Sequence, residues 1–329
     1  MIEQIMGTQI DGIKKYVKDC IPRNSLPYRY LPSSNTDSLV NLVLMEIENV
    51  ASLSDGKIFG LSEKGVIVAL AAIRPQEWEA RVLGDSAYCI SLWILKECND
   101  LLKFVKCVVS SASKKASRSL ITAKCWSSET KVIHALEGSG FLLMDTLVDV
   151  FYVNNEHSRS DSCAIPMPDG LCIRNARVDD ENGLRDLAKE AFYNHFGRFH
   201  ADSNIAQSTA TSVYQEWISS SIHGWADLIF VAEDTNTKHL AGFSAWKTPS
   251  SDELSHGINL GHYSIGAVSS AFAGRGLFKH LTQTGMHALK DCSAIEGPTH
   301  INNIRVLRGY TSLGWKIADS RHAFHTWIN

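Results

Sequence analysis

Two glycines stand one residue apart in the stretch SSAFAGRGLFKHL, which runs from Ser269 to Leu281. The apolar run Ile265–Val268 before them predicts a strand, and the residues Gly276–Leu289 have the spacing of a helix. A strand, a glycine turn and a helix N-terminus together present free backbone N–H groups to an anion such as a phosphate. A plain tight turn is the alternative. The stretch lacks the third glycine of a dinucleotide fingerprint and the Gly-Lys-Ser/Thr of a P-loop, so it favours neither NAD nor ATP.

A second stretch with chemical potential follows at THINNIRVLRGYTSLGW, which begins at Thr299. A helix is predicted over Ile304–Leu313, and Asn303 and Tyr310 are seven residues apart, which is about two helical turns. Both side chains are therefore expected on roughly one face. A structural reading also exists, in which Tyr310 and Trp315 are core aromatic residues of an amphipathic helix.

Taken together, the two stretches resemble the GNAT superfamily of acyl-CoA-dependent N-acetyltransferases. The family pattern is Arg or Gln, two residues, Gly, one residue, then Gly or Ala, and it lies on Ala273, Gly274, Arg275, Gly276, Leu277 and Phe278. Gly276 matches the central glycine, whereas Ala273 and Phe278 depart from the pattern. The departures leave the binding of a pyrophosphate by main-chain N–H groups intact. The Asn303 and Tyr310 spacing matches the second family segment.

The resemblance implies roles for these residues. The cofactor-binding set would be Ala267, Val268, Ala273, Gly274, Arg275, Gly276, Leu277, Phe278 and Asn303. The strand His262–Val268 would diverge from its neighbour and bind the pantetheine arm, and a main-chain N–H near Ala267 or Val268 would polarise the thioester carbonyl. Asn303 would contact the pantetheine arm. Tyr310 would protonate the departing thiolate, since a phenol with a pKa of about 10 is protonated at neutral pH.

Within the superfamily, the sequence is most similar to dTDP-fucosamine-type sugar N-acetyltransferases, which are tandem proteins of surface-polysaccharide pathways. The likeness covers nearly the whole chain and includes Phe192–Asp202 and the ending Ser320–Trp327. It implies acetyl-CoA as co-substrate and an amino sugar, free or nucleotide-linked, as acceptor. The expected substrate-binding residues are Arg198, His200, Asp202, His262 and Tyr263, and Arg198 would meet a phosphate bidentately. No general base is evident; His200, His262 and Tyr263 are candidates.

Two alternatives stay open at this point. The acceptor of an acetyltransferase could be another small amine, such as an amino acid or an aminoglycoside. A chain that has lost its chemistry would instead be a non-catalytic acyl-CoA-binding scaffold. The departures at Ala273 and Phe278 favour the scaffold, and the presence of Asn303 and Tyr310 favours the enzyme.

The order of predicted elements repeats along the chain, which suggests two copies of one α/β fold. Each copy would be a GNAT-like domain with a mixed, mostly antiparallel central sheet flanked by helices. A degenerate domain is expected over 1–153, a polar linker over 154–169 and a catalytic domain over 170–329. Predicted helices lie at Ile10–Cys20, Thr36–Leu53, Leu101–Ser111, Thr130–Leu136, Asp179–Phe192, Ser208–Ile222, Gly276–Leu289 and Ile304–Leu313. Predicted strands lie at Ile58–Leu61, Val66–Ile73, Ala87–Leu95, Leu120–Cys125, Phe141–Val153, Cys172–Ala176, Leu228–Ala232, Leu240–Trp246, His262–Val268 and Ile317–Ile328.

The first copy lacks the glycine loop. Its corresponding stretch, LKECNDLL, runs from Leu95 to Leu102 and contains no glycine. Glu97 and Asp100 would also repel a diphosphate at close range. The sequence therefore predicts a first domain that does not bind CoA and that either supports the second domain or forms a wall of its substrate cleft.

The composition of the chain argues against several other classes of function. The 329 residues are 44% hydrophobic and 20% charged, with a net charge of −3, so we expect a globular protein with no nucleic-acid partner. No segment approaches the about 18 apolar residues that span a bilayer. The eight cysteines are scattered and form no CxxC, which is typical of reduced thiols in a cytoplasmic protein, and with the 13 histidines they form no metal-ligand spacing. We expect no metal, and a monomer or homodimer.

Overall fold

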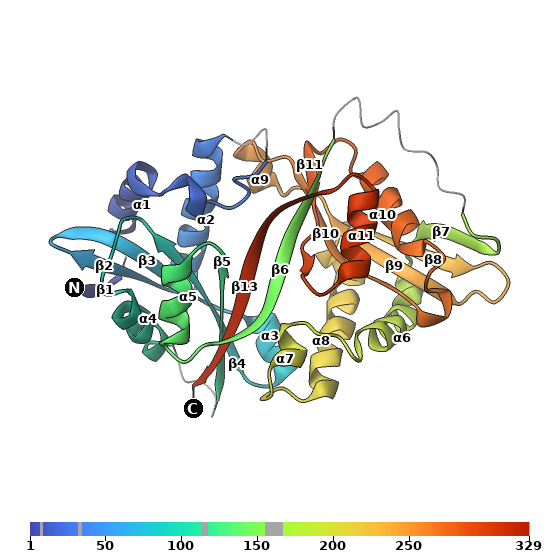
Figure 1. Cartoon of the computed structure of the whole chain (residues 1–329), viewed down its shortest axis with the longest axis horizontal. Helices are drawn as coiled ribbons and strands as arrows, with labels where there is room; N and C mark the ends of the chain where they lie inside the picture. The colour runs from blue at the N-terminus through green and yellow to red at the C-terminus, as the bar shows by residue number, and fades with distance from the viewer. Residues whose placement is uncertain (7–8, 32–34, 113–117, 155–166, 329) are drawn as a thin grey trace. The chain divides into compact units, whose positions relative to one another are not determined.

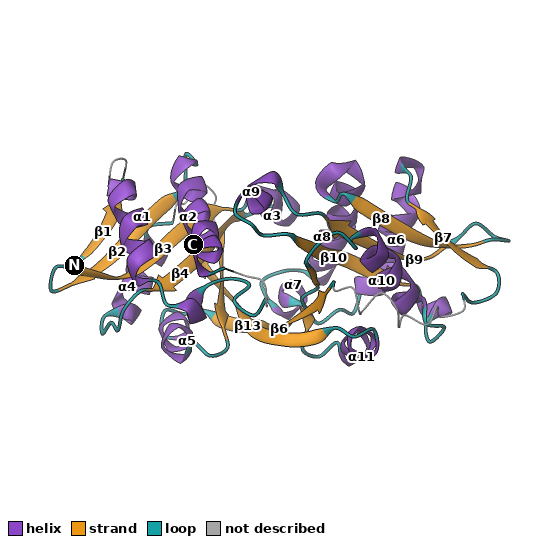
Figure 2. Cartoon of the chain, turned by 90° about the horizontal axis from the view of Figure 1, so that it is seen from above, coloured by secondary structure: helices purple, strands orange, loops and turns teal. Residues whose placement is uncertain are grey.

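The computed structural model describes residues 1–6, 9–31, 35–112, 118–154 and 167–328 (Figure 1). The chain divides into two compact units. The first unit comprises Met1–Thr146 together with Ser320–Asn329, and the second comprises Leu147–Asp319. In each unit, helices lie on both faces of a layer of strands (Figure 2).

The sheet of the first unit has the strand order β1-β2-β3-β4-β5-β13. All neighbours in it are antiparallel except β4 and β5, which are parallel. Its elements are β1 (Ile2–Ile5), α1 (Gln9–Cys20), α2 (Thr36–Ser52), β2 (Lys57–Glu63), β3 (Val66–Pro75), α3 (Glu77–Leu83), β4 (Ser86–Ile94), α4 (Leu101–Ser110), β5 (Ser119–Trp126), α5 (Thr130–Glu137), the start of β6 (Leu142–Val153) and the end of β13 (Lys316–Ile328).

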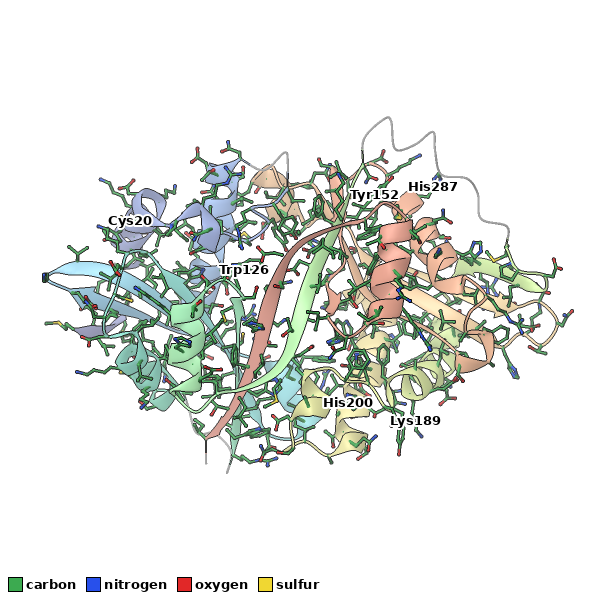
Figure 3. The ribbon with its side chains drawn as sticks, in the orientation of Figure 1. Cys20, Trp126, Tyr152, Lys189, His200 and His287 are labelled. Carbon is green, nitrogen blue, oxygen red and sulfur yellow. The ribbon has the colours of Figure 1, made fainter. Side chains whose placement is uncertain are left out.

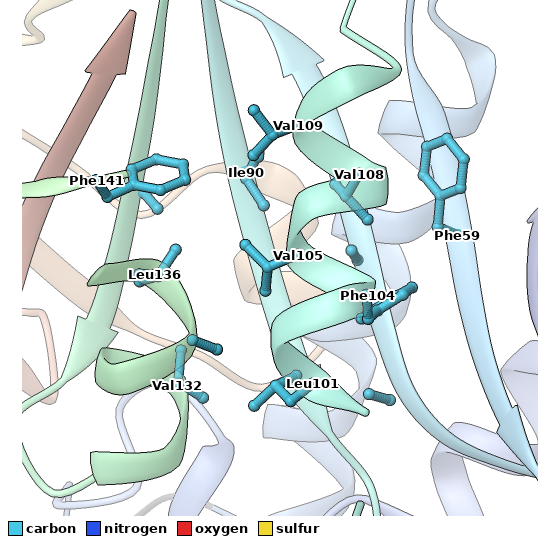
Figure 4. Close-up of a cluster of buried hydrophobic side chains, with 14 of the residues drawn as sticks. Phe59, Ile90, Leu101, Phe104, Val105, Val108, Val109, Val132, Leu136 and Phe141 are labelled. Carbon is cyan, nitrogen blue, oxygen red and sulfur yellow. The ribbon is translucent and has the colours of Figure 1, made fainter. Parts of the chain in front are cut away.

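The core of the first unit follows from the helical periodicity of α4. Leu101, Phe104, Val105 and Val108 recur every three or four residues, and all are buried. They pack with side chains of the sheet and with Leu136 of α5 in one apolar cluster (Figure 4). Burial of one such side chain contributes roughly 1.5–3 kcal/mol.

The sheet of the second unit has the order β6-β11-β10-β9-β8-β7, with β12 paired to β6. Its one parallel pair is β10 with β11, among antiparallel neighbours. Its elements are β7 (Leu171–Asn175), α6 (Glu181–Phe192), α7 (Arg198–Ala201), α8 (Gln207–Ser220), β8 (Leu228–Asp234), β9 (Leu240–Lys247), α9 (Ser251–Ser255), β10 (Leu260–Val268), α10 (Leu277–Ala288), β11 (Ala294–Glu296), β12 (Thr299–His300) and α11 (Ile304–Ser312).

The last strand of each half pairs in the sheet of the other half. β6 ends the first half of the sequence, yet its residues 147–153 pair with β11 and β12 of the second unit. β13 ends the second half, yet Arg321–Ile328 pairs with β5 of the first unit. The linear division expected at residues 153 and 170 therefore differs from the compact units, because the final strands are exchanged. Most of the expected linker, 155–166, lies outside the described residues.

The predicted fold class is confirmed: each unit is a mixed, mostly antiparallel sheet flanked by helices. The sequence reading missed the short elements β1, α3, α7, α9, β11 and β12. The seven described cysteines are free thiols. No described helix has the length and apolar character needed to cross a membrane, and the described residues contain no group of His, Cys, Asp or Glu that could hold a metal ion.

Candidate functional site

β10 parts from β11 after three residue pairs. Leu260–His262 pairs in parallel with Ala294–Glu296, whereas β10 stays paired with β9 as far as Val268. β11 ends at Glu296, and beyond Pro298, which has no N–H to donate, the chain forms β12 against β6. The edge of β10 beyond His262 therefore opens away from β11. This is the strand divergence that the resemblance implied.

The backbone direction distinguishes Val268 from Ala267 at this open edge. The Ser269 amide donates to the Ala241 carbonyl at 2.9 Å, on the side of β9. Backbone groups alternate between the two edges of a strand, so the N–H of Val268 faces the open edge and that of Ala267 faces β9. Of the two amides named from the sequence, Val268 is the one positioned to meet a ligand between β10 and β11.

The glycine loop presents a run of free amides. Gly274 and Gly276 have φ values of +79° and +81°, which favour glycine, and Gly276 is the residue before α10. Within the described part of the chain, the amides of residues 274–278 donate no hydrogen bond, and the next donor is Lys279 to the Gly276 carbonyl at 2.9 Å. A Cβ at either glycine would meet no atom within 4 Å. Five successive amides without a hydrogen-bond partner among the described residues thus lie at the positive end of a 12-residue helix.

A carboxylate that sequence reasoning missed anchors the start of this loop. Glu190 of α6 accepts hydrogen bonds from the Ser270 amide at 2.8 Å, from the Ser270 hydroxyl at 2.7 Å and from the Ser269 hydroxyl at 3.2 Å. The hydrogen bonds from Ser270 lower the pKa of Glu190 below its usual value. Glu190 therefore fixes the turn between β10 and the glycines.

Tyr310 lies in the last turn of α11 and is 1% exposed. Its ring packs 4.6 Å from Trp315, 5.3 Å from Phe278 and 6.0 Å from Tyr263, measured between centroids. A Cβ placed on Gly297 would lie 2.7 Å from the Tyr310 hydroxyl, so that oxygen lies beside the backbone where β11 ends. Burial, and to a lesser degree Tyr263, raises the pKa of Tyr310 well above 10, so the phenol stays protonated.

Asn303 is at the N-cap position of α11 rather than inside the helix. Its side-chain amide donates to the Thr299 hydroxyl at 3.4 Å, and its carbonyl accepts from the Leu307 amide at 3.0 Å. The side chain is half-buried. Asn303 and Tyr310 thus mark the two ends of one short helix beside the opening of β10.

Phe278, which departs from the family pattern, is accommodated by a glycine. A Cβ on Gly309 of α11 would lie 2.5 Å from an atom of the Phe278 ring. The large side chain of Phe278 therefore occupies the space left by the absent side chain of Gly309. The Phe278 ring packs edge-on against Tyr310, at an interplanar angle of 80°.

We expect Gly309→Ala to displace the Phe278 ring, which destabilises the fold by about 1–3 kcal/mol. Thermal unfolding measures this. Gly12→Ala in α1, where a Cβ meets no atom within 4 Å, is the matched helical control and should be neutral or stabilising. Equal unfolding temperatures for Gly309→Ala and the wild type would contradict this close packing of Phe278 against Gly309.

The three acceptor-side residues predicted from the sequence lie in or just after α7. The Arg198 guanidinium lies 4.1 Å over the Phe199 ring. Asp202 is buried and accepts hydrogen bonds from the backbone and side chain of Asn204, at 2.9 and 3.1 Å, which is a local turn. His200, labelled in Figure 3, lies 3.4 Å from the Thr211 hydroxyl through Nε2.

The hydrogen bonds of Thr211 assign the tautomer of His200. The Thr211 hydroxyl donates to the Gln207 carbonyl at 2.9 Å, so it accepts from the imidazole, and Nε2 carries the proton. Nδ1 is then a bare acceptor, and it is buried without a hydrogen-bond partner. Burial lowers the pKa of His200, so the ring is neutral at pH 7.

Aromatic rings to which the sequence analysis gave no role surround His200. Tyr214 stacks on it with centroids 5.7 Å apart, and His195 lies edge-on at 6.1 Å. His300 of β12 lies 4.6 Å from His195. Gly197 allows this packing, since a Cβ there would lie 2.5 Å from the Tyr214 hydroxyl. The density of aromatic residues and histidines over 192–200 was the available signal.

His262 was a candidate general base, but its contacts make it a cation. Nδ1 lies 2.8 Å from a Glu296 oxygen, and Nε2 lies 3.3 Å from a Glu253 oxygen. Burial opposes a charge on the ring, but the hydrogen bonds to the two carboxylates outweigh it and raise the pKa of His262 to about 9. A ring that is already protonated at pH 7 cannot accept a proton. Burial raises the pKa of Tyr263 above that of a free phenol, so its hydroxyl also holds its proton at pH 7.

In the first unit, a carboxylate occupies the place that corresponds to the glycine loop. The connection from β4 to α4 matches that from β10 to α10. Glu63 of β2 accepts from the amides of Asn99 and Asp100 at 2.8 and 3.3 Å, and from the Asn99 side chain at 3.3 Å. The Asn99 amide contributes most to lowering the pKa of Glu63. Amides that could meet a phosphate are thus already paired with an anion of the protein.

Comparison with known proteins agrees with this geometry at the level of the fold. No protein-family model matches the chain, and no curated protein matches it. Among solved structures, a GCN5-related N-acetyltransferase from Sphaerobacter thermophilus superposes with a TM-score of 0.61 at 14% identity, covering 100% of this chain and 96% of that one. A tandem GNAT protein from the clavulanic acid biosynthesis pathway superposes with a TM-score of 0.58 at 11% identity, covering 99% and 98%. The chain therefore has a tandem GNAT fold.

Proposed function

We propose that this chain is an acetyl-CoA-dependent N-acetyltransferase whose acceptor is the primary amine of a small molecule. The observation that carries the proposal is the run of five free amides at residues 274–278, which follows a strand that has parted from its neighbour. The diphosphate of acetyl-CoA would bind these amides and the N-terminus of α10. The pantetheine arm would lie along the open edge of β10 and end near Tyr310.

In the proposed reaction the neutral amine attacks the thioester carbonyl directly. The carbon–nitrogen bond forms as the carbon–sulfur bond breaks, and the Val268 amide stabilises the negative charge that develops on the carbonyl oxygen. Tyr310 donates its proton to the leaving sulfur. Its raised pKa suits this role, because the phenol remains protonated until the thiolate forms.

The amine must lose a proton, and His200 is the remaining candidate among the three groups named from the sequence. Its neutral ring and bare Nδ1 suit a base. Because Nδ1 is shielded from solvent, we propose that it acts through a bound water rather than on the amine itself.

We propose a nucleotide-linked amino sugar as the acceptor. The exposed ring of Phe196 offers an apolar surface beside the rings of His195 and His300, and Tyr193, nearby in the sequence, is also exposed. Such a surface suits a sugar ring, which has apolar C–H faces and polar hydroxyl groups. We further propose that the first unit binds no CoA, because Glu63 takes the amides there.

Thiol release from acetyl-CoA, measured with a panel of amines, tests the proposed function. The panel contains a nucleotide-linked amino sugar, the free amino sugar, an aminoglycoside and amino acids. We expect the highest kcat/KM for the nucleotide-linked sugar. Release with an amino acid alone would reject the sugar and keep the enzyme, whereas no release with any amine would favour the scaffold.

A further inference from the structure

The ion pairs of His262 join three elements of the second unit at one point. Glu296 belongs to β11, His262 to β10, and Glu253 to α9. Both ring nitrogens of His262 face carboxylate oxygens, at 2.8 Å and 3.3 Å, and carboxylates only accept hydrogen bonds. Both nitrogens must therefore donate, so the ring is an imidazolium held from two sides.

The two carboxylates are themselves held in place. The second oxygen of Glu253 accepts from the Ser250 amide and hydroxyl, both at 2.7 Å, in a capping box that opens α9. Glu296 is 9% exposed and is the last residue of β11. The imidazolium thus bridges a capped helix and a strand end rather than two mobile side chains.

The bridge lies where β10 and β11 separate. His262 and Glu296 face each other as the last pair of the parallel register. The next residue in β10 is Tyr263, and the strand bulges before Ile265. The residue that follows the end of β11 is Gly297, whose backbone lies against the Tyr310 hydroxyl. A change at the bridge would therefore move the open edge of β10 relative to Tyr310.

We infer that His262 is a positioning residue, a charged clamp that fixes where β10 leaves β11 and so sets the gap between the Val268 amide and the Tyr310 hydroxyl. This inference rests on the proposed function, in which the thioester lies in that gap. The clamp acts on the geometry of the reacting groups, whereas the diphosphate would bind at the glycine loop, which begins beyond the end of β10.

The charged groups around the His262 ring determine how the clamp responds to pH. Glu253 and Glu296 favour the cation, and Lys247 of β9 is the cross-strand neighbour of His262. Lys247 donates to the Trp225 carbonyl and lies 4.7 Å over the Trp225 ring. Because the pKa of His262 is raised from 6.5 to about 9 by folding, the clamp is complete below 6.5 and is lost as pH rises through about 9.

The test is His262→Gln, which has no charge and reaches one carboxylate at most. We expect kcat to fall about 10- to 100-fold while the Kd for CoA stays within about 3-fold of the wild-type value. His239→Gln, in the exposed turn between β8 and β9, is the matched control and should change neither. At saturating amine, wild-type kcat should fall above about pH 9, and this fall should be absent from His262→Gln.

Glu296→Gln and Glu253→Gln keep the inference falsifiable if His262→Gln fails to fold. Because Glu296 links the two strands, its variant should lose more kcat than that of Glu253. Unchanged kcat in Glu296→Gln, or a parallel loss of CoA affinity, would overturn the clamp. Amide hydrogen exchange tests the clamp independently of the proposed function, because it needs no transferase activity. Faster exchange at residues 263–268 in Glu296→Gln than in the wild type would support the clamp. Equal exchange in the two proteins would reject it.

Discussion

Tyr310→Phe should lower kcat about 100- to 10,000-fold, the usual contribution of a positioned general acid. The affinity for CoA should stay the same, because the hydroxyl lies beside Gly297, where β11 ends, and the diphosphate would bind to main-chain amides that the substitution leaves in place. The fold should keep its stability within about 1 kcal/mol, since the hydroxyl forms no hydrogen bond with any described residue. Steady-state kinetics and a CoA titration on the same preparation measure both quantities.

Tyr263→Phe is the matched control for this loss. Tyr263 is half-buried, and its hydroxyl lies against the backbone of Gly266, on β10 itself. We expect a loss of less than about 10-fold, because removal of this hydroxyl takes no proton donor from the sulfur. If Tyr263→Phe abolished turnover and Tyr310→Phe did not, the general acid would be Tyr263.

Gly276→Ala should weaken CoA binding by at least 10-fold, which is about 1.4 kcal/mol. The added methyl group would meet no protein atom, so it would project into the open space before the free amides. The positive φ of +81° also strains an alanine by about 1–2 kcal/mol. Isothermal titration with CoA measures the affinity, and we expect one equivalent per chain for the wild type.

Gly65→Ala is the control that separates the effect of backbone strain from the effect of blocking the phosphate-binding amides. Gly65 lies in the turn between β2 and β3 with a φ of +78°, and a Cβ there also meets no atom within 4 Å. Both variants should lose similar stability, and Gly276→Ala alone should lose CoA affinity. Equal CoA affinity in the two variants would show that the glycine loop is not part of the binding site. Binding of two equivalents of CoA per wild-type chain would contradict the proposal that Glu63 closes the first unit to CoA.

The local parts of the fold and of the site were predictable from the sequence. The glycines at 274 and 276 predicted the turn and the start of α10, because a positive φ and a helix N-terminus are properties of a few neighbouring residues. The seven-residue spacing of Asn303 and Tyr310 predicted one helix beside the site, although Asn303 proved to cap that helix.

The long-range parts were not predictable. A strand sequence does not name its partner, so nothing in the residues of β6 or β13 indicated that each would pair in the other half's sheet. The same limit applies to the carboxylates. Glu190 and Glu63 lie 80 and 36 residues from the amides they accept from, and Glu253 converts His262 from a candidate base into a cation.

The packing of Phe278 shows why a departure from a family pattern can mislead. Taken alone, a large side chain at this position suggests a blocked loop. In the structure, Gly309 supplies the space on the neighbouring helix, and the loop amides stay open. Compensation of this kind depends on two residues that meet only after folding.

The most direct test of the central claim is a crystal structure of the full chain with CoA at millimolar concentration. We predict that oxygens of the diphosphate lie within hydrogen-bond distance of the amides at residues 274–278, with the pantetheine arm along the open edge of β10. A diphosphate bound elsewhere on the chain, or no CoA bound at that excess, would contradict the account.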